Sequence, residues 1–343
     1  MSVSIEISSG RSVALVLRNG ATALVTSLLL LAAGSAAAAT FTAFDVTGAS
    51  ATYPLGNNAG GSVTGFYRDS SDSFRGFVRA ADGTITTFDP QGSTSTEPQS
   101  INRKGAVTGF YYNESSYTYG FVRSAGGKIT TFSVNGSIQT VALSINNARS
   151  VTGFYIDASG AAHGFIRTAD GTMTEIDEPG AGDTFAQAIN ANGDVTGYFD
   201  DSKGLHGFLR TADGTITSFD VPGESQPYAV AINGTDVITG DAGNGKGSLT
   251  GFVRAVDGTV TTFDPAGSTG TVADSINAKG AITGYWGDGN GVQHGFVRSA
   301  KARIKSFDPP GAIATEPRSI NDNGVIAGFF SDSNGYHGFI RTP

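Results

Sequence analysis

The stretch that decides the fold runs from Ser275 to Gly311 and reads SINAKGAITGYWGDGNGVQHGFVRSAKARIKSFDPPG. It holds four short segments separated by turn residues, and the same four segments recur seven times along the chain. The glycine of the Thr-Gly pair marks the period, which is 44 residues five times and 43 residues once. These glycines are Gly65, Gly109, Gly153, Gly197, Gly240, Gly284 and Gly328, and Ala327 replaces the threonine in the last copy.

The amino-acid composition restricts which partners the protein can bind and which reactions it can catalyse. The 343 residues carry a formal charge of -8, which becomes -9 once Glu6, Arg11 and Arg18 are removed with residues 1–39. An acidic surface repels phosphate groups, so we expect neither nucleic acid nor an anionic membrane as a partner. The chain has no cysteine, which excludes thiol catalysis, thiolate metal sites and disulfides.

The first 39 residues have the pattern of a secretory signal peptide. Arg11 and Arg18 precede an apolar run from Ala21 to Leu31, and small residues follow from Gly34 to Ala39. The pattern predicts cleavage near Ala37 to Ala39, a secreted or periplasmic protein, and no integral membrane span after cleavage. The alternative is an uncleaved membrane anchor, for which this stretch is barely long enough and too rich in alanine.

Each copy from Thr40 onward predicts four β-strands. In the copy quoted above these are Ser275 to Asn277, Ile282 to Trp286, Gly295 to Arg298 and Ile304 to Asp308. Asn followed by Gly three residues later favours a tight turn after the first strand. A longer loop, such as residues 90–98, is expected to lead from the fourth strand to the next copy.

Four antiparallel strands every 40 to 45 residues are typical of a propeller blade. We therefore predict an all-β fold in which residues 40–343 form one seven-bladed β-propeller domain and a monomer. The seventh copy reaches Pro343 before its fourth strand, and Phe41 to Asp45 match that missing strand. The N-terminal strand is therefore expected to complete the seventh blade and close the ring.

The first strand of each blade should lie nearest the axis of the ring. Its small residues suit a crowded position and predict a narrow channel lined by hydroxyls and methyls. They are Gly56, Ser100, Ser144, Ala188, Ala231, Ser275 and Ser319.

Several of these motifs resemble the HAF-repeat family of extracellular bacterial proteins. The family's His-aromatic signature appears four times, with glycine in place of its middle alanine, alongside repeated Asp-Gly-Thr-Ile-Thr and Ser-Ile-Asn segments. Arg75, Tyr119 and Thr250 stand where the other copies have histidine. The resemblance implies an exported, propeller-like repeat array and no defined reaction. The four signatures begin at His163, His206, His294 and His337.

The repeated charged and aromatic residues are interpreted as structural. Histidines that recur in different blades do not converge on one metal ion or one catalytic triad. Adjacent aromatic residues such as Phe110 and Tyr111 should pack against the two neighbouring blades. We expect ion pairs between the third-strand arginines and the acidic residues that end the fourth strands. The arginines are Arg79, Arg123, Arg167, Arg210, Arg254, Arg298 and Arg341, and the acids are Asp45, Asp89, Asp177, Asp220, Asp264 and Asp308.

The loops between the second and third strands are where the copies differ. Each contains an Asp or Asn four residues after the Thr-Gly glycine, which either caps the turn or binds Ca²⁺, and we favour capping. The fifth copy has Asp241-Ala242 in place of an aromatic pair. The sequence offers no catalytic, cofactor-binding or metal-ligating residue, and no cofactor is predicted. The candidate ligand-facing residues are Asp69, Asp157, Asp201, Asp241, Trp286, Asp288 and Asp332.

Two functions fit these observations. The first is an exported binding or adhesion module that holds a glycan or a protein through the loop-rich face. The second is an extracellular polysaccharide-acting enzyme, a glycosidase or lyase, that uses loop carboxylates such as Asp200 and Asp201, or Asp69 and Asp72, as acid and base. That chemistry requires two carboxyl groups facing each other across a substrate.

Overall fold

The computed structural model describes residues 39–243 and 247–343, which contain 28 β-strands and no helix. The predicted signal peptide, apart from Ala39, lies outside the described residues, as do Asn244 to Lys246 of the fifth copy. None of the described residues forms a helix that is long and apolar enough to cross a membrane.

The strands follow one another in the order that the repeat predicts. They are β1 (Thr40–Phe44), β2 (Ala51–Asn57), β3 (Val63–Arg68), β4 (Phe74–Arg79), β5 (Ile85–Phe88), β6 (Ser93–Ile101), β7 (Val107–Asn113), β8 (Thr118–Arg123), β9 (Ile129–Phe132), β10 (Gln139–Ile145), β11 (Val151–Ile156), β12 (Ala162–Arg167), β13 (Met173–Ile176), β14 (Thr184–Ile189), β15 (Val195–Asp201), β16 (Gly204–Arg210), β17 (Ile216–Phe219), β18 (Gln226–Ile232), β19 (Ile238–Gly243), β20 (Leu249–Arg254), β21 (Val260–Phe263), β22 (Gly270–Ile276), β23 (Ile282–Gly287), β24 (Gln293–Arg298), β25 (Ile304–Phe307), β26 (Ala314–Ile320), β27 (Ile326–Asp332) and β28 (Gly335–Thr342).

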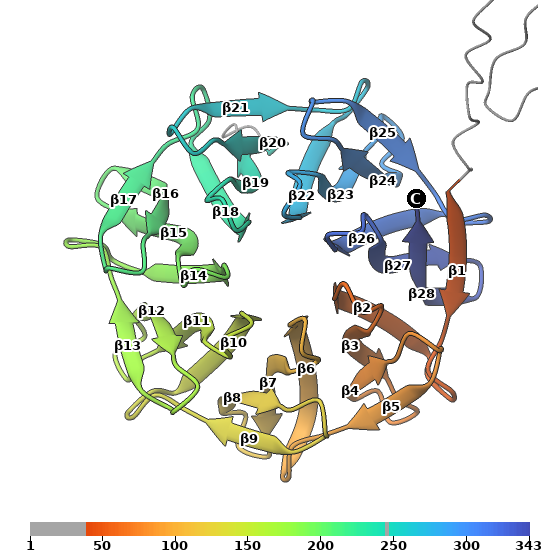
Figure 1. Cartoon of the computed structure of the whole chain (residues 1–343), viewed down its shortest axis with the longest axis horizontal. Helices are drawn as coiled ribbons and strands as arrows, with labels where there is room; N and C mark the ends of the chain where they lie inside the picture. The colour runs from red at the N-terminus through yellow and green to blue at the C-terminus, as the bar shows by residue number, and fades with distance from the viewer. Residues whose placement is uncertain (1–38, 244–246) are drawn as a thin grey trace, which may run out of the picture. The chain divides into compact units, whose positions relative to one another are not determined.

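We number the repeat units 1 to 7 along the chain, so that unit 1 is β2 to β5 and unit 7 is β26 to β28 followed by β1. Within each unit the strands pair antiparallel in chain order, as in β14-β15-β16-β17. The fourth strand of unit 7 is β1, which pairs antiparallel with β28 from Thr40 opposite Thr342 to Phe44 opposite Gly338. Figure 1 shows the units around a central axis, with the first strand of each unit innermost and the fourth strand outermost.

The first strands are longer than the sequence predicts, and each contains a β-bulge. Strand β6 begins at Ser93, inside the segment expected to be a loop, while Asn102 lies beyond its end in the turn. In all seven first strands the register against the second strand skips one residue. These bulge residues are Leu55, Gln99, Leu143, Gln187, Val230, Asp274 and Arg318.

The bulge explains the repeated Thr-Gly pair. A Cβ atom added to Gly109 would lie 2.2 Å from the carbonyl oxygen of Glu97 on the bulged strand, and the other six glycines have the same clash at 1.9 to 2.3 Å. The preceding threonine is fully buried, and Thr108 donates a hydrogen bond from Oγ1 to the carbonyl of Phe121 at 2.8 Å. The glycine therefore lets the bulged first strand approach closely, and the threonine bonds the third strand, so the pair fixes the second strand to both neighbours.

The third-strand arginines make a different contact from the predicted ion pairs, so that prediction is wrong. Six of the seven guanidinium groups lie over a phenylalanine ring from the fourth strand of the preceding unit, as Arg123 does over Phe88 at 4.9 Å. The planar guanidinium buries against the ring face by a cation–π interaction. Arg210 has no such ring because Ile176 stands at the equivalent position. The other pairs are Arg79/Phe44, Arg167/Phe132, Arg254/Phe219, Arg298/Phe263 and Arg341/Phe307.

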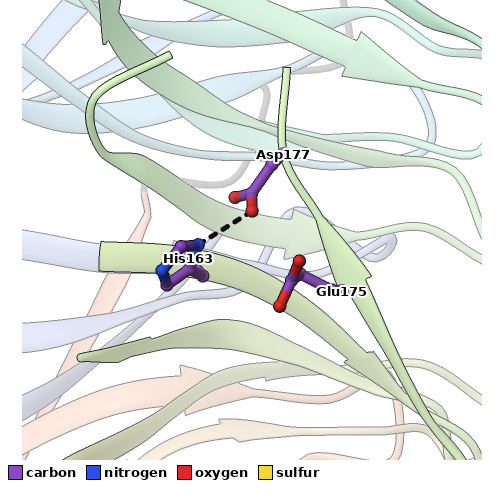
Figure 2. Close-up of side chains that lie close together, drawn as sticks. All are labelled: His163, Glu175 and Asp177. Carbon is purple, nitrogen blue, oxygen red and sulfur yellow. Dashed lines mark hydrogen bonds and ion pairs between the residues drawn. The ribbon is translucent and has the colours of Figure 1, made fainter. Parts of the chain in front are cut away.

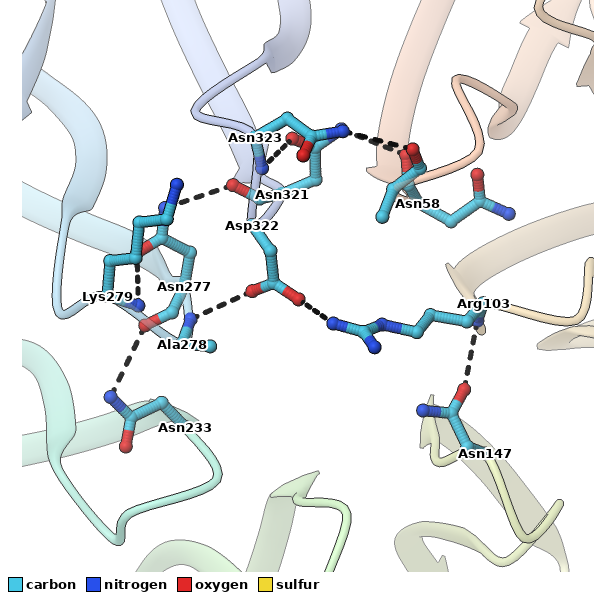
Figure 3. A network of polar contacts seen from close by, with 11 residues as sticks. Asn58, Arg103, Asn147, Asn233, Asn277, Ala278, Lys279, Asn321, Asp322 and Asn323 are labelled. Carbon is cyan, nitrogen blue, oxygen red and sulfur yellow. Dashed lines mark hydrogen bonds and ion pairs between the residues drawn. The ribbon is translucent and has the colours of Figure 1, made fainter.

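Seven buried asparagines link the units around the axis. The Nδ2 of Asn102 donates to the carbonyl of Asn146 at 2.9 Å, and its Oδ1 accepts hydrogen bonds from the amides of Lys104 and Ala106. The same inter-unit bond, at 2.9 to 3.3 Å, runs from each asparagine to the next and returns to the start of the series. Figure 3 shows part of this series. Its members are Asn58, Asn102, Asn146, Asn190, Asn233, Asn277 and Asn321.

Candidate functional site

Five of the candidate ligand-facing carboxylates cap the hairpin between the second and third strands. The Oδ1 of Asp157 accepts hydrogen bonds from the amides of Ser159 at 2.8 Å and Ala161 at 3.0 Å. The structure therefore confirms the turn-capping interpretation. Hydrogen bonds of this kind hold the pKa of each carboxyl below its ordinary value, so these groups are ionised near neutral pH. The five are Asp69, Asp157, Asp201, Asp288 and Asp332.

The carboxylate pairs proposed for an enzyme do not face each other across a cavity. Asp200 and Asp201 are adjacent on β15, so their side chains point to opposite faces of the sheet. Asp200 accepts a hydrogen bond from the amide of Asp183 at 2.7 Å. Asp72 forms an ion pair with Arg68 at 3.2 Å, whereas Asp69 pairs with Arg75 at 2.9 Å.

The four histidines are the partners of four of the six acidic residues that end the fourth strands, while Asp89 lies near Arg75 and Asp264 accepts a hydrogen bond from Thr250. Nδ1 of His206 lies 2.6 Å from Asp220, and its Nε2 lies 3.2 Å from the turn-capping Asp201. Although burial lowers it, these contacts raise the pKa of His206 above its ordinary value. The ring also packs on Phe199, with centroids 5.4 Å apart. The same arrangement joins His163 to Asp177, His294 to Asp308 and His337 to Asp45.

In unit 6, Trp286 takes the place beside His294 that Phe199 has beside His206 in unit 4. Its indole packs on His294 with centroids 4.9 Å apart, and Nε1 donates to Ser306 Oγ at 3.0 Å. Its side chain is half-buried. Because of these two contacts, both the indole nitrogen and one face of the indole ring already have partners within unit 6.

Unit 3 contains the one group of metal-ligating side chains found among the described residues. Figure 2 shows His163, Glu175 and Asp177, whose ligand atoms all lie within 4.8 Å of one another. The hydroxyl of Tyr155 donates to Glu175, and His163 Nδ1 lies 2.8 Å from Asp177. The His–Asp contact recurs in three other units without a third acid, so we interpret the pair as part of the repeated sheet structure. Glu175 is the one member of the group that is particular to unit 3.

Asp241 is buried between strands. The other six units have an aromatic ring at this position of the second strand, whereas Asp241 in unit 5 is 7% exposed and accepts no hydrogen bond from any residue that the structure describes. Burial, followed by the negative charge of Asp274, raises the pKa of Asp241 to about 7. The six rings are Phe66, Phe110, Phe154, Tyr198, Tyr285 and Phe329.

The axial cavity contains charged residues that the sequence analysis missed. The small first-strand residues line this 240 Å³ cavity as predicted, but so do the bulge residues. Asp274 and Arg318 form an ion pair at 2.9 Å, and the guanidinium also lies 3.6 Å from Glu316. Burial raises the pKa of Asp274 to about 6, although Arg318 acts in the opposite direction. We call Asp241, Asp274, Glu316 and Arg318 the axial charge cluster, of which Asp274 and Arg318 line the cavity.

The asparagines line a second hollow of 380 Å³ at the end of the axis where the first strands turn into the second strands. Arg103 of unit 2 forms an ion pair with Asp322 of unit 7 there, although the two units are not neighbours in sequence. Asp322 also accepts a hydrogen bond from the amide of Ala278 at 2.9 Å, as Figure 3 shows.

The opposite, loop-rich end exposes apolar side chains. Four of the five most exposed large apolar residues among those described lie at this end, three in its loops and Tyr336 at the start of β28, while Val256 lies in a turn between a third and a fourth strand. One of the four, Tyr336, packs on Tyr53 with ring centroids 5.6 Å apart, and Tyr53 packs on Phe66 at 5.1 Å. We call Tyr53, Phe66, Phe74, Phe329 and Tyr336 the aromatic cluster of units 7 and 1. The four exposed residues are Tyr117, Ile138, Ile313 and Tyr336.

Proteins of known structure share this fold at low sequence identity. A catalytically inactive virginiamycin B lyase from Staphylococcus aureus is similar with a TM-score of 0.60 and 15% identity over 89% of this chain and 100% of its own. A lectin from Burkholderia pseudomallei has a TM-score of 0.56 and 13% identity over 84% and 95% of the two chains. The β-propeller domain of the Trilobed protease from Pyrococcus furiosus has a TM-score of 0.58 and 10% identity over 85% and 94%.

These similarities define the class as all-β and propeller-type. No protein-family model matches the chain, and no curated protein matches it. At these identities the likeness shows the fold alone, so the function has to be inferred from the sites.

Proposed function

We propose that this chain is an exported binding module, built as a seven-bladed β-propeller that β1 closes, and that it holds a glycan at its loop-rich end. The pairing of β1 with β28 and the return of the asparagine series from Asn321 to Asn58 support a closed ring. The resemblance to HAF-repeat proteins and the signal-peptide pattern of residues 1–39 support export.

The aromatic cluster of units 7 and 1 carries the proposal. Tyr336 is 44% exposed and packs on Tyr53 and, edge to face, on Phe329, so one ring that the cluster holds in place reaches solvent at the loop-rich end. Exposed aromatic patches rimmed by polar groups mark binding sites, and tyrosine offers both a ring face and a hydroxyl. Arg68, which lies over Phe74 at 5.6 Å, and Asp72 supply the polar rim. A sugar ring, with apolar faces and hydroxyl edges, matches this surface, and the lectin among the similar structures is consistent with it.

A glycan array tests this function. The full chain should show saturable binding to at least one glycan, and Tyr336→Ala should abolish it. Tyr117→Ala is the matched control, because Tyr117 is 46% exposed at the same end but belongs to unit 2 and lies outside the cluster. The proposal fails if no glycan binds, or if both variants bind as the wild type does. Saturable binding to an envelope protein instead would replace the glycan with a protein ligand.

The second candidate is an extracellular polysaccharide-acting enzyme that uses loop carboxylates. The lowered pKa values of the turn-capping aspartates argue against it, because none of these groups carries a proton to donate near neutral pH. Cleavage of a polysaccharide by the wild type and its loss in Asp201→Asn would favour the enzyme over the binding module.

A further inference from the structure

The bulge position breaks the repeat symmetry in the axial cavity. In units 1 to 5 the residue at this position is neutral, but units 6 and 7 carry Asp274 and Arg318. A β-bulge changes the direction in which a side chain points, and β-bulges are enriched next to active sites. The five neutral residues are Leu55, Gln99, Leu143, Gln187 and Val230.

The axial charge cluster has more negative than positive groups. Oδ1 of Asp274 contacts Arg318, whereas its Oδ2 is buried and accepts no hydrogen bond from the described residues. Asp241 is also buried without a donor in the described part of the chain, and Glu316 shares the single guanidinium. Two carboxyl groups thus share one cation, and the third, that of Asp241, adds its negative charge to that of Asp274. Buried carboxylates without partners are unfavourable unless a cation or a hydrogen-bond donor joins them.

We propose that the axial cavity binds a small hydroxylated primary amine, with its ammonium group paired to the carboxylate of Asp274 and the charge of Asp241 adding to the attraction. The cavity volume of 240 Å³ is below the roughly 300 to 1,000 Å³ of most drug-sized sites, which restricts the ligand to a small molecule. Gln99, Gln187 and Ser275 line the same cavity and offer amide and hydroxyl groups to the ligand's hydroxyls.

An ammonium group fits this cluster better than a metal ion. Ca²⁺ needs six to eight oxygen ligands, whereas Asp274 is the one carboxylate among the described residues that line the cavity. An ammonium group needs only a few directional hydrogen bonds. The raised pKa values of Asp241 and Asp274 agree with this interpretation, because a bound cation would stabilise their ionised forms.

Calorimetric titration of the full chain with glucosamine, with glucose as the neutral control ligand, tests the proposal. We expect saturable 1:1 binding of glucosamine and at least tenfold weaker binding of glucose. The double variant Asp274→Gln with Arg318→Gln carries at both bulges the residue that units 2 and 4 already use, and it leaves Glu316 beside a glutamine bulge residue, as Glu97 is beside Gln99 in unit 2, so it should fold. Glucosamine should bind it roughly tenfold to a hundredfold more weakly, as the loss of a charge-assisted hydrogen bond implies.

Two further variants distinguish the axial charge cluster from the rest of the cavity and from the loop-rich end. Leu143→Gln introduces a glutamine at the bulge of unit 3 without removing a charge, so it should retain glucosamine binding. Tyr336→Ala should retain it as well, because the proposed glycan surface is a different site. The proposal is overturned if glucose binds as tightly as glucosamine, if no saturable heat appears, or if the folded double variant binds normally. Displacement of glucosamine by micromolar Ca²⁺ would assign the cluster to a metal ion instead.

Discussion

Replacing one asparagine of the axial series by alanine is the sharpest test of how the units are held together. Asn146 is 7% exposed and sits between units 3 and 4. Its Nδ2 donates to the carbonyl of Asn190 at 3.1 Å, and its Oδ1 accepts from the amides of Ala148 and Ser150, each at 3.0 Å. Asn146→Ala removes all three hydrogen bonds and leaves buried polar groups without partners.

The expected effect follows from these contacts. Each hydrogen bond contributes about 1 kcal/mol net, so the variant should lose about 3 kcal/mol of unfolding free energy before any desolvation term. A kcal/mol shifts the melting temperature of a large domain by about 2 °C, which gives a fall of about 6 °C. Thermal unfolding followed by circular dichroism measures it.

Asn147→Ala is the matched control on the neighbouring residue. Asn147 is half-buried and accepts one hydrogen bond, from the amide of Arg103 at 3.0 Å, so its loss should shift the melting temperature by about 2 °C or less. If Asn146→Ala melts within 1 °C of the wild type, or no lower than Asn147→Ala, the inter-unit asparagine bonds do not stabilise the fold.

Three other predictions address the bulge, the pH response and unit 3. Gly109→Ala places a Cβ 2.2 Å from the carbonyl oxygen of Glu97, so we expect a loss of more than about 4 kcal/mol, seen as insoluble protein or a collapsed melting curve; normal melting would contradict the close approach. The raised pKa values of Asp241 and Asp274, about 7 and 6, mean that stability is lost as the pH rises from about 4 to 7, and the raised pKa values of His206 and His337 mean that it is lost further above about pH 6.5. The lowered pKa values of Asp157 and Asp332 mean that it is also lost below about pH 4, so melting should peak near pH 4 to 5, and a melting temperature that climbs from pH 5 to 8 would refute this. Glu175→Thr gives unit 3 the residue that units 1 and 2 have at Thr87 and Thr131, and Zn²⁺ should not change the melting temperature of this variant. A Zn²⁺-induced rise seen in the wild type but not in the variant would assign a metal to unit 3.

The period of the sequence was sufficient to predict the four-stranded units, because strand and turn preferences act within one copy. It also identified Phe41 to Asp45 as the partner of the last third strand, now seen as β1 against β28. Turn capping by Asp157 and its equivalents was predictable for the same reason, since donor and acceptor lie within four residues of each other.

The sequence did not reveal the contacts between units or the consequences of the bulge. The alternation of faces breaks at Asp274 and Arg318, so period-2 reasoning could not place them in the axial cavity. Opposite charge alone predicts that the arginines pair with the acids. In the structure Arg123 packs on a phenylalanine ring from the preceding unit, and Asp220 bonds a histidine of its own unit. The absence of an aromatic ring at Asp241 was the one visible signal of the charge cluster.

Closure of the ring by β1 is tested most directly by an engineered disulfide, because the chain has no cysteine of its own. Thr42 and Ile340 lie directly opposite each other on β1 and β28. The variant with cysteine at both positions should form an intramolecular disulfide under mild oxidation, visible as a mobility shift on a non-reducing gel and as a higher melting temperature. A control with cysteines at Thr130 of β9 and at Ile340 should form none. Equal crosslinking of the two variants, or none in either, would contradict closure through β1.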